Sequence, residues 1–273
     1  MDLMITPLVS MRGISKRYGG VQALADVDLD IYSGEVHALV GDNAAGKSTL
    51  IKALAGAVQR DSGTIRFDGR EVEINSPRDA KALGIETVYQ DLALADNLDV
   101  ASNIYLGREL TLSGPFKFFL DLRKMETNAR TLLSRLKINI PSIRQKVRTM
   151  SGGQRQSIAI ARSVAFNAKV VILDEPTAAL GVEETRKVYD LVREMRTQGL
   201  AVLMICHNIN HVFEHSQRIT VLKTGRFVAS RRIEDTSHDE ILRMIVSGSA
   251  EPPSTERGAT TTPAHAPVQV VAG

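Results

Sequence analysis

The sequence predicts an α/β fold built around a phosphate-binding loop, and three observations support this prediction. The segment GDNAAGKST, at 41–49, follows the apolar strand pattern GEVHALV and leads into an apolar helix pattern. The segment VVILDEPT, at 170–177, places two acids directly after four apolar β-formers. Strand and helix patterns alternate after that point, as they do when helices cover a parallel sheet.

The N-terminal region predicts mainly strands. Residues 8–40 have the pattern of strands joined by turns, and an apolar helix is expected over 49–58. The segment TIRFDGREVEI predicts an antiparallel hairpin with Asp68 and Gly69 at its turn. A short helix over 77–83 and a short strand over 85–89 follow. We therefore expect an antiparallel β subdomain beside the parallel core.

The middle of the chain predicts an inserted helical subdomain, because the pattern at about 91–150 is helical and irregular. Beyond Ser151 we expect an apolar helix, a strand over 170–173, a charged helix over 182–197 and a strand over 200–206. A hairpin over 218–229 and a helix over 238–247 complete a domain of residues 1–248. The segment 249–273 is rich in Pro, Ser, Thr, Ala and Gly without periodicity, which predicts a disordered tail.

Composition narrows the class of protein. A chain of 273 residues with 43% hydrophobic and 24% charged residues is typical of a globular protein. Its formal charge of +3 comes from scattered basic residues, so no nucleic-acid partner is expected. Cys206 is the only cysteine, which excludes an intrachain disulfide and favours a reducing compartment. No apolar run approaches the roughly 20 residues that cross a bilayer, so we expect no membrane span.

The loop at 41–49 has the pattern of glycine, four residues, then Gly-Lys-Ser. In such a loop, backbone amides and the start of the next helix converge on phosphate oxygens. Lys47 is then expected to reach the β- and γ-phosphates, and the hydroxyl of Ser48 to bind Mg²⁺.

The acids of VVILDEPT are the expected counterpart of this loop. A buried parallel strand that ends in Asp174 places the carboxylate at the carboxyl edge of the sheet, beside the phosphate loop. Asp174 would hold Mg²⁺ through water, and Glu175 would polarise the water that attacks the γ-phosphate. Small-molecule kinases, GTPases, helicases and transport ATPases all remain open at this point.

A second glycine-rich segment, MSGGQ at 150–154, distinguishes among these classes. With its surroundings it resembles the ATP-binding subunits of ABC transporters over residues 8–248, nearly the whole ordered chain. Their signature is usually LSGGQ, and Met150 replaces its leucine here; Ser151 precedes Asp174 by 23 residues, about the family spacing. The resemblance implies that two such domains pair head to tail, each signature gripping the γ-phosphate held by the other's phosphate loop.

The resemblance also assigns single residues. Tyr18 matches the aromatic residue that stacks on adenine, Gln90 a glutamine that touches Mg²⁺ and the attacking water, and His207 the histidine that contacts the γ-phosphate. The catalytic set is then Glu175, His207 and Gln90, and the Mg²⁺ set is Ser48, Gln90 and Asp174. The residues expected to bind ATP are Tyr18, Gly41, Asp42, Asn43, Ala44, Ala45, Gly46, Lys47, Ser48, Thr49, Ser151, Gly152, Gly153 and Gln154.

Two positions depart from the family pattern. Ala44 stands where the loop commonly has glycine, although Gly41 and Gly46 are intact, so ATP binding is expected to survive. Gly181 replaces an aspartate that helps to couple the two sites, which puts that coupling in doubt. The resulting segment AALG, at 178–181, resembles a variant of carbohydrate-importer ATPases.

The segments NLDVASNIYLGRE, at 97–109, and DLRKM, at 121–125, resemble ATPases for monosaccharide uptake of the ribose, xylose and fructose type. The resemblance implies a homodimer, or a pair with a second ATP-binding subunit, on the cytoplasmic side of the inner membrane. The protein would bind permease subunits through residues 91–108. It would interact with an extracytoplasmic sugar-binding protein only indirectly, through the permease. The alternatives are a soluble ABC ATPase of translation or DNA repair, a phosphate-loop kinase, a regulatory nucleotide sensor, and an exporter.

Overall fold

The computed structural model describes residues 6–250 and contains two sheets. The smaller sheet has four antiparallel strands in the order β2-β1-β4-β5. Its strands are β1 (Val9–Tyr18), β2 (Val21–Ile31), β4 (Ser62–Phe67) and β5 (Arg70–Val72). Asp68 and Gly69 form the β4–β5 turn with φ of 51° and 74°, as the expected hairpin requires. The predicted N-terminal antiparallel region is confirmed.

The larger sheet has six strands in the order β10-β9-β3-β8-β7-β6. All neighbours are parallel except the last hairpin, in which β10 runs antiparallel to β9. The strands are β3 (Val36–Val40), β6 (Ile85–Val88), β7 (Val170–Asp174), β8 (Ala201–Ile205), β9 (Arg218–Lys223) and β10 (Arg226–Arg232). The predicted parallel core is therefore confirmed.

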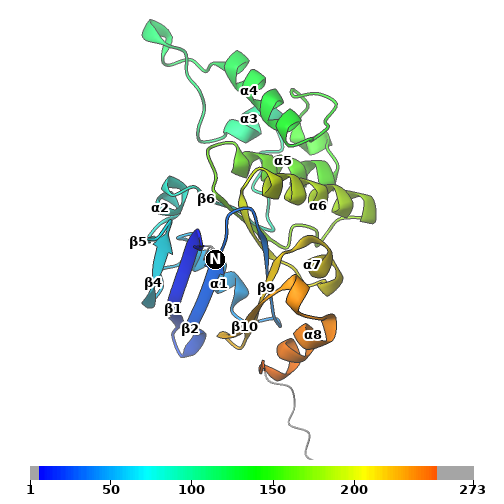
Figure 1. Ribbon diagram of the computed structural model, residues 1–273. Helices are drawn as coiled ribbons and strands as arrows, with labels where there is room; N and C mark the ends of the chain where they lie inside the picture. The colour runs from blue at the N-terminus through cyan, green and yellow to red at the C-terminus, as the bar shows by residue number, and fades with distance from the viewer. Residues whose placement is uncertain (1–5, 251–273) are drawn as a thin grey trace, which may run out of the picture.

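Helices cover the larger sheet and extend beyond it (Figure 1). In Figure 1, α3 and α4 lie at one end of the molecule, and α7 and α8 lie toward the other. The helices are α1 (Lys47–Leu54), α2 (Pro77–Ala82), α3 (Val100–Tyr105), α4 (Leu122–Arg135), α5 (Gly152–Val164), α6 (Val182–Thr197), α7 (Ile209–His215) and α8 (His238–Ser247). Within residues 6–250, no helix is long and apolar enough to cross a membrane.

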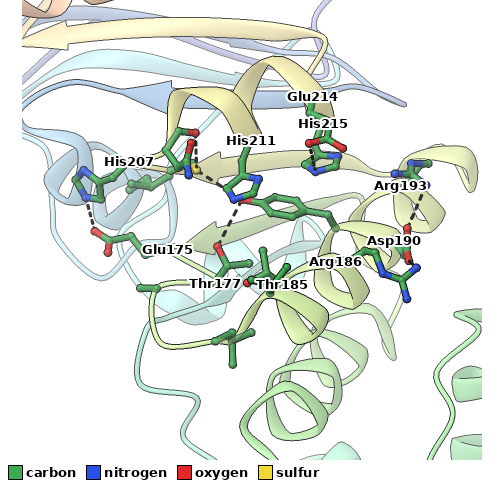
Figure 2. Close-up of a pocket in the computed structure, with 17 residues that line it drawn as sticks. Glu175, Thr177, Thr185, Arg186, Asp190, Arg193, His207, His211, Glu214 and His215 are labelled. Carbon is green, nitrogen blue, oxygen red and sulfur yellow. Dashed lines mark hydrogen bonds and ion pairs between the residues drawn. The ribbon is translucent and has the colours of Figure 1, made fainter.

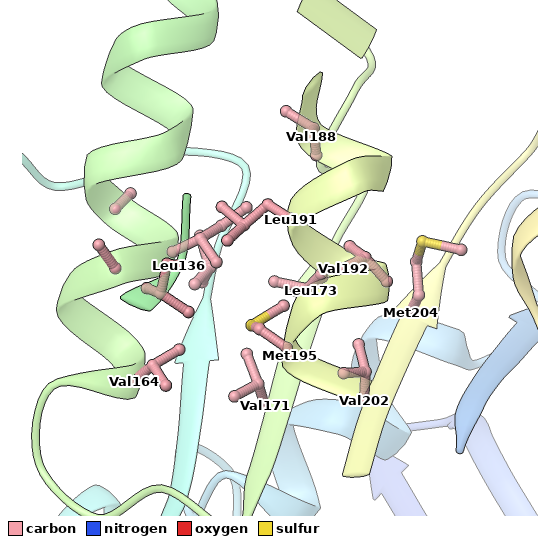
Figure 3. Close-up of a cluster of buried hydrophobic side chains, with 14 of the residues drawn as sticks. Leu136, Val164, Val171, Leu173, Val188, Leu191, Val192, Met195, Val202 and Met204 are labelled. Carbon is pink, nitrogen blue, oxygen red and sulfur yellow. The ribbon is translucent and has the colours of Figure 1, made fainter. Parts of the chain in front are cut away.

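Strand β8 and the first four residues of β7 are apolar, and both of their faces are buried. On β7, Val171 and Leu173 point into one core, whereas Val170 and Ile172 point into the other. The first core lies between the sheet and helices α5 and α6, where Val192 and Met195 contact the strands (Figure 3). The second core lies between the two sheets around α1. The carboxyl edge of the sheet is thus held from both sides.

The structure corrects one expected element boundary. The first helix spans Lys47–Leu54 rather than 49–58, because the chain turns at Gly56, where φ is +70°. The segment at about 91–150 is helical and irregular, as expected: α4 begins at Leu122, with Asp121 as its N-cap, and Thr111 pairs with Leu120 in an antiparallel bridge just before it. The tail expected from residue 249 lies outside the described residues from 251 onward.

Candidate functional site

The phosphate loop connects β3 to α1, and its two glycines lie where a side chain would not fit. Gly41 has φ of +148°, and a Cβ there would come 2.2 Å from the carbonyl oxygen of Leu222. Gly46 has φ of +96°, and a Cβ there would lie 2.7 Å from the carbonyl oxygen of Ala23. These positions require glycine because the loop passes against neighbouring backbone. The start of α1 is thereby held at the carboxyl end of β3.

Lys47 is folded back onto this loop. Its Nζ donates hydrogen bonds to the carbonyl oxygens of Gly41, at 2.7 Å, and Asp42, at 2.9 Å. Burial lowers the pKa of Lys47, and the negative charges of Glu175, Asp42 and Asp174 oppose that shift. An anion bound in the loop would add a further favourable charge to this buried ammonium group.

The two acids lie at the carboxyl end of β7. Burial, followed by the charge of Glu175, raises the pKa of Asp174. Glu175 has φ of +50° and its amide donates to the carbonyl oxygen of Ile205 at 3.2 Å. Its Oε1 lies 2.6 Å from Nε2 of His207, which follows β8 (Figure 2). The sheet therefore brings together two expected catalytic residues from different strand ends.

The oxygen donors expected to hold Mg²⁺ suit that ion chemically. Ser48 offers a hydroxyl, Gln90 an amide oxygen and Asp174 a carboxylate, which are the hard ligands that Mg²⁺ prefers. The raised pKa of Asp174 indicates that a cation at this edge would be stabilising, because it would offset both burial and the neighbouring carboxylate.

The second glycine segment forms the exposed start of α5. Ser151 is the N-cap, its Oγ accepting from the amide of Gln154 at 3.3 Å, while Gln154 Oε1 accepts from the amide of Ser151 at 3.0 Å. Gly152 is exposed, whereas Gly153 is buried where a Cβ would lie 2.8 Å from the Cβ of Glu184. Among residues 6–250, no hydrogen bond joins Ser151–Gln154 to the phosphate loop.

Tyr18 and Gln90 lie at the ends of strands. Tyr18 ends β1 with 47% of its surface exposed, and the ammonium group of Lys16 lies 5.7 Å from its ring centroid. Gln90 follows β6 and is exposed. The chain after it is held by α5, because Arg162 donates to the carbonyl oxygens of Leu92 and Ala93 at 2.8 Å each.

Three contacting residues were not expected from the sequence. Arg162 of α5 holds the chain after Gln90 through the carbonyl oxygens of Leu92 and Ala93. Lys223 donates to Asp42 Oδ2 at 2.6 Å and to the carbonyl oxygen of Ile245 at 2.6 Å, which joins the phosphate loop to α8. Glu184 accepts from the amide of Gly181 at 3.2 Å and packs under Gly153. Arg162 and Lys223 stand in no short motif, so only the tertiary structure reveals them. Glu184 is the third residue of α6, a position where glutamate commonly accepts from the N-cap amide, and that local signal could have found it.

The two departures from the family pattern differ in their backbone. Ala44 has φ of +66°, a left-handed conformation that favours glycine. Gly181, the N-cap of α6, has φ of −70°, which any residue adopts. A Cβ at Gly181 would find only Glu184 Oε2, at 3.6 Å. The glycine at 181 is therefore not required by the fold.

A phosphate loop, a strand followed by paired acids, and a second glycine-rich segment at a helix start are together typical of an ATP-binding cassette. The model of the ABC transporter family matches residues 24–178, and the chain belongs to that family. It is 47% identical over 251 residues to the fructose import ATP-binding protein FrcA of Rhizobium meliloti, covering 90% of this chain and 96% of that protein. It is also 47% identical to the xylose/arabinose import ATP-binding protein XylG of Sulfolobus acidocaldarius, covering 89% and 95%.

A solved structure supports the same fold. The dimeric post-hydrolysis state of an ATP-binding cassette bound to ADP and Pi aligns with a TM-score of 0.68. The alignment covers 82% of this chain and 98% of that one at 24% identity. At this identity the likeness shows the fold alone, and the predicted fold class is confirmed.

Proposed function

We propose that this chain is the ATP-hydrolysing subunit of an ABC importer, and that two copies enclose two ATP molecules between them. The exposed N-terminus of α5 carries this proposal. Ser151 and Gly152 are solvent-exposed at a glycine-rich helix N-terminus, and the positive end of the helix dipole favours an anion there. The chain's own phosphate loop is a separate element after β3, so the signature is free to bind a phosphate held by a second copy.

A pair of identical chains is the simplest complete assembly. The two import relatives are matched over 96% and 95% of their length, so neither has room for a second cassette. The cassette bound to ADP and Pi is dimeric. A homodimer provides each phosphate loop with a signature segment; a second ATP-binding subunit would serve equally.

Within each composite site, this chain's residues would bind ATP and move a proton. Lys47 would exchange its bonds to Gly41 and Asp42 for phosphate oxygens, and Tyr18 would stack on the adenine. Glu175 would accept a proton from the attacking water, and His207 would orient that carboxylate. Mg²⁺, held by Ser48, Gln90 and Asp174, would supply positive charge to the phosphates when bound.

A permease has a suitable docking place beside the segment that follows Gln90. A cavity of about 350 Å³ lies between β6, α3 and α5. Arg108 spans it by an ion pair with Glu86 at 2.6 Å, and its guanidinium lies 4.7 Å from the ring centroid of Phe166. A permease loop in this cavity would push on the segment that Arg162 ties to the signature helix. The chain would then lie on the cytoplasmic face of the inner membrane.

The proposed cargo is a monosaccharide. The relatives named for fructose and for xylose or arabinose import motivate this choice, together with the AALG segment. The sugar would pass from an extracytoplasmic binding protein to the permease, without touching this subunit. ATP-driven closure of the dimer would switch the permease, and hydrolysis would reopen it.

The dimer is tested with the Glu175→Gln variant, which should bind ATP and accumulate as a dimer in size-exclusion chromatography. Adding Ser151→Asp should abolish that dimer, because aspartate caps α5 as well as serine but repels phosphate. Ser151→Asn is the matched neutral control and should dimerise. A monomer for Glu175→Gln with ATP and permease present would refute the proposal.

The import function is tested by ATPase assays in proteoliposomes with the permease and its sugar-loaded binding protein. A monosaccharide among fructose, xylose, arabinose and ribose should stimulate hydrolysis. Two results would favour a soluble ABC ATPase: association of the protein with ribosomes or DNA instead of the permease, and a rate of ATP hydrolysis that the permease does not change.

A further inference from the structure

Helix α7 places three potential metal ligands on one side. His211 and His215 are one helical turn apart, and Glu214 lies beside them. One ligand atom from each residue lies within 4.8 Å of the other two. The Oε2 of Glu214 is 3.6 Å from the Nε2 of His215. Figure 2 shows the three side chains directed from α7 toward α6, in the pocket that also contains Glu175 and His207.

The two imidazole rings are held in place by Tyr189 of α6. The ring of His215 stacks on Tyr189 with centroids 4.0 Å apart, and the ring of His211 lies 5.0 Å from the same ring. The two imidazoles are nearly parallel, at 15°. Such rings have already lost much of their rotamer freedom, which lowers the cost of organising them around an ion.

His211 also has an unmet bonding requirement. Its Nδ1 is buried and has no hydrogen-bond partner in the described structure. A buried ring nitrogen without a partner is uncommon, because leaving it unsatisfied costs free energy. Burial lowers the pKa of His215.

From this geometry we propose that His211, Glu214 and His215 form a binding site for a divalent transition-metal ion of the Zn²⁺ type. Two imidazole nitrogens and a carboxylate oxygen are a common zinc ligand set, with water as the fourth ligand. This nitrogen-rich set disfavours Mg²⁺, so the site is distinct from the one proposed beside ATP. The two arginines that line the same pocket are each paired with an acid, Arg193 with Asp190 at 3.1 Å and Arg186 with Glu183 at 3.2 Å.

To bind the ion, the three ligand atoms must move closer together. Zinc bonds of about 2.0–2.1 Å place tetrahedral ligand atoms about 3.3 Å apart, whereas these atoms lie within 4.8 Å of one another. Glu214 can adjust its position relative to both imidazoles, because 67% of its side chain is exposed, and the imidazoles themselves need only small rotations. The ion would brace α7, which starts two residues after His207. The site thus adjoins the hydrolysis machinery without sharing a ligand with it.

The test is calorimetric titration of the nucleotide-free protein with ZnCl₂ in the presence of millimolar Mg²⁺. We expect one equivalent to bind, and His215→Ala and His211→Ala each to weaken the affinity at least tenfold. His238→Ala removes a histidine that stacks on Phe213 of α7 but offers no ligand atom to the site, so it is the matched control for packing on α7 and should bind as the parent does. The His207→Ala variant should also retain binding, which separates the site from the Glu175–His207 pair.

A spectroscopic and a thermal readout complement the titration. Co²⁺ in place of Zn²⁺ should give the intense visible absorption of a tetrahedral site, and Glu214→Gln should change it. Because a bound ion stabilises the folded state, Zn²⁺ should raise the Tm of the parent and of His238→Ala, but not of His215→Ala. No zinc binding by the parent, binding unchanged in His215→Ala, or binding lost in His207→Ala would overturn the proposal.

Discussion

Glu175 and His207 lie 2.6 Å apart, from Oε1 to Nε2, although 32 residues separate them in the chain. The parallel register of β7 and β8 produces this contact, because Asp174 pairs with Ile205 and each residue follows its strand end. The side chains are 28% and 46% exposed, so water and a phosphate can reach both. The pair therefore has the geometry of a carboxylate base and the group that orients it.

Replacing His207 should slow hydrolysis more than it weakens binding. We expect His207→Ala to reduce kcat on the order of 10²-fold, the lower end of typical acid–base contributions, with little change in the Kd for ATP. Steady-state ATPase assays and equilibrium nucleotide binding measure the two quantities. His238→Ala should leave both unchanged, and a His207→Ala enzyme with parental kcat would contradict the role.

Ala44 is expected to strain the phosphate loop. Its φ of +66° costs an alanine about 1 kcal/mol relative to glycine. Ala44→Gly should therefore leave the free energy of unfolding unchanged or raise it by up to about 1 kcal/mol, since glycine also gains freedom in the unfolded chain. Urea unfolding measures the difference.

The neighbouring alanine provides the control for this prediction. Ala45 is 2% exposed and has no positive φ, so Ala45→Gly should destabilise the protein by about 1 kcal/mol. ATP affinity should survive in Ala44→Gly. Equal destabilisation by the two substitutions would show that the loop conformation at Ala44 carries no strain.

Glu184 is expected to connect the signature segment to the start of α6. Its carboxylate accepts from the amide of Gly181, and this hydrogen bond lowers the pKa of Glu184. Its side chain also packs against Gly153. Glu184→Ala should weaken the ATP-dependent dimer about tenfold in the Glu175→Gln background, because it removes the support beneath the signature.

Glu184→Gln is the matched control, since its amide oxygen can still accept from Gly181 and its stem can still pack on Gly153. It should retain most of the dimer affinity measured by analytical ultracentrifugation with ATP. If Glu184→Ala dimerises as tightly as Glu184→Gln, then Glu184 has no part in presenting Ser151 and Gly153.

The features that could be predicted from the sequence are those that depend on local motifs. The loop at 41–49 and the acids after β7 follow from fixed spacings, because each depends on one strand end and the residues beside it. Residues 106–121 were harder to predict. Pro115 and the run of Phe116, Phe118 and Phe119 have no regular period, and the three rings are exposed by 59%, 83% and 64%.

Interactions between distant segments could not be predicted from spacing. Arg162 and the carbonyl oxygens of Leu92 and Ala93 are about 70 residues apart, and the contact exists only because α5 packs beside the segment after β6. Lys223 reaches Asp42 across 181 residues because β9 pairs with β3 in the sheet, and the two residues lie at neighbouring strand ends. The roles of the site residues remain predictions that the proposed experiments address.

His37 should make stability depend on pH above the range in which the carboxylates titrate. It is fully buried on β3, with Nε2 2.8 Å from Oγ1 of Thr220. Burial lowers its pKa from 6.5 to about 3. Between these pH values the imidazole is protonated in the unfolded chain and neutral in the folded protein. The contribution of His37 to the free energy of unfolding is therefore complete above pH 6.5 and is lost as the pH falls.

At pH 5.0 the loss should reach about 2 kcal/mol relative to pH 7.5, at about 1.4 kcal/mol per pH unit. Hydrogen bonds lower the pKa of Asp61 and of Asp79, so these carboxylates titrate below this window. Burial raises the pKa of Asp174, so its protonation changes stability in the opposite direction and cannot produce this loss.

Urea unfolding in steps of half a pH unit measures the slope. His37→Gln, which can still bond to Thr220, should be less stable at neutral pH and should lose the His37 part of the slope, leaving the part contributed by His215, whose pKa burial also lowers. His238→Gln should keep the whole slope, and a slope unchanged in His37→Gln would assign the effect to another group.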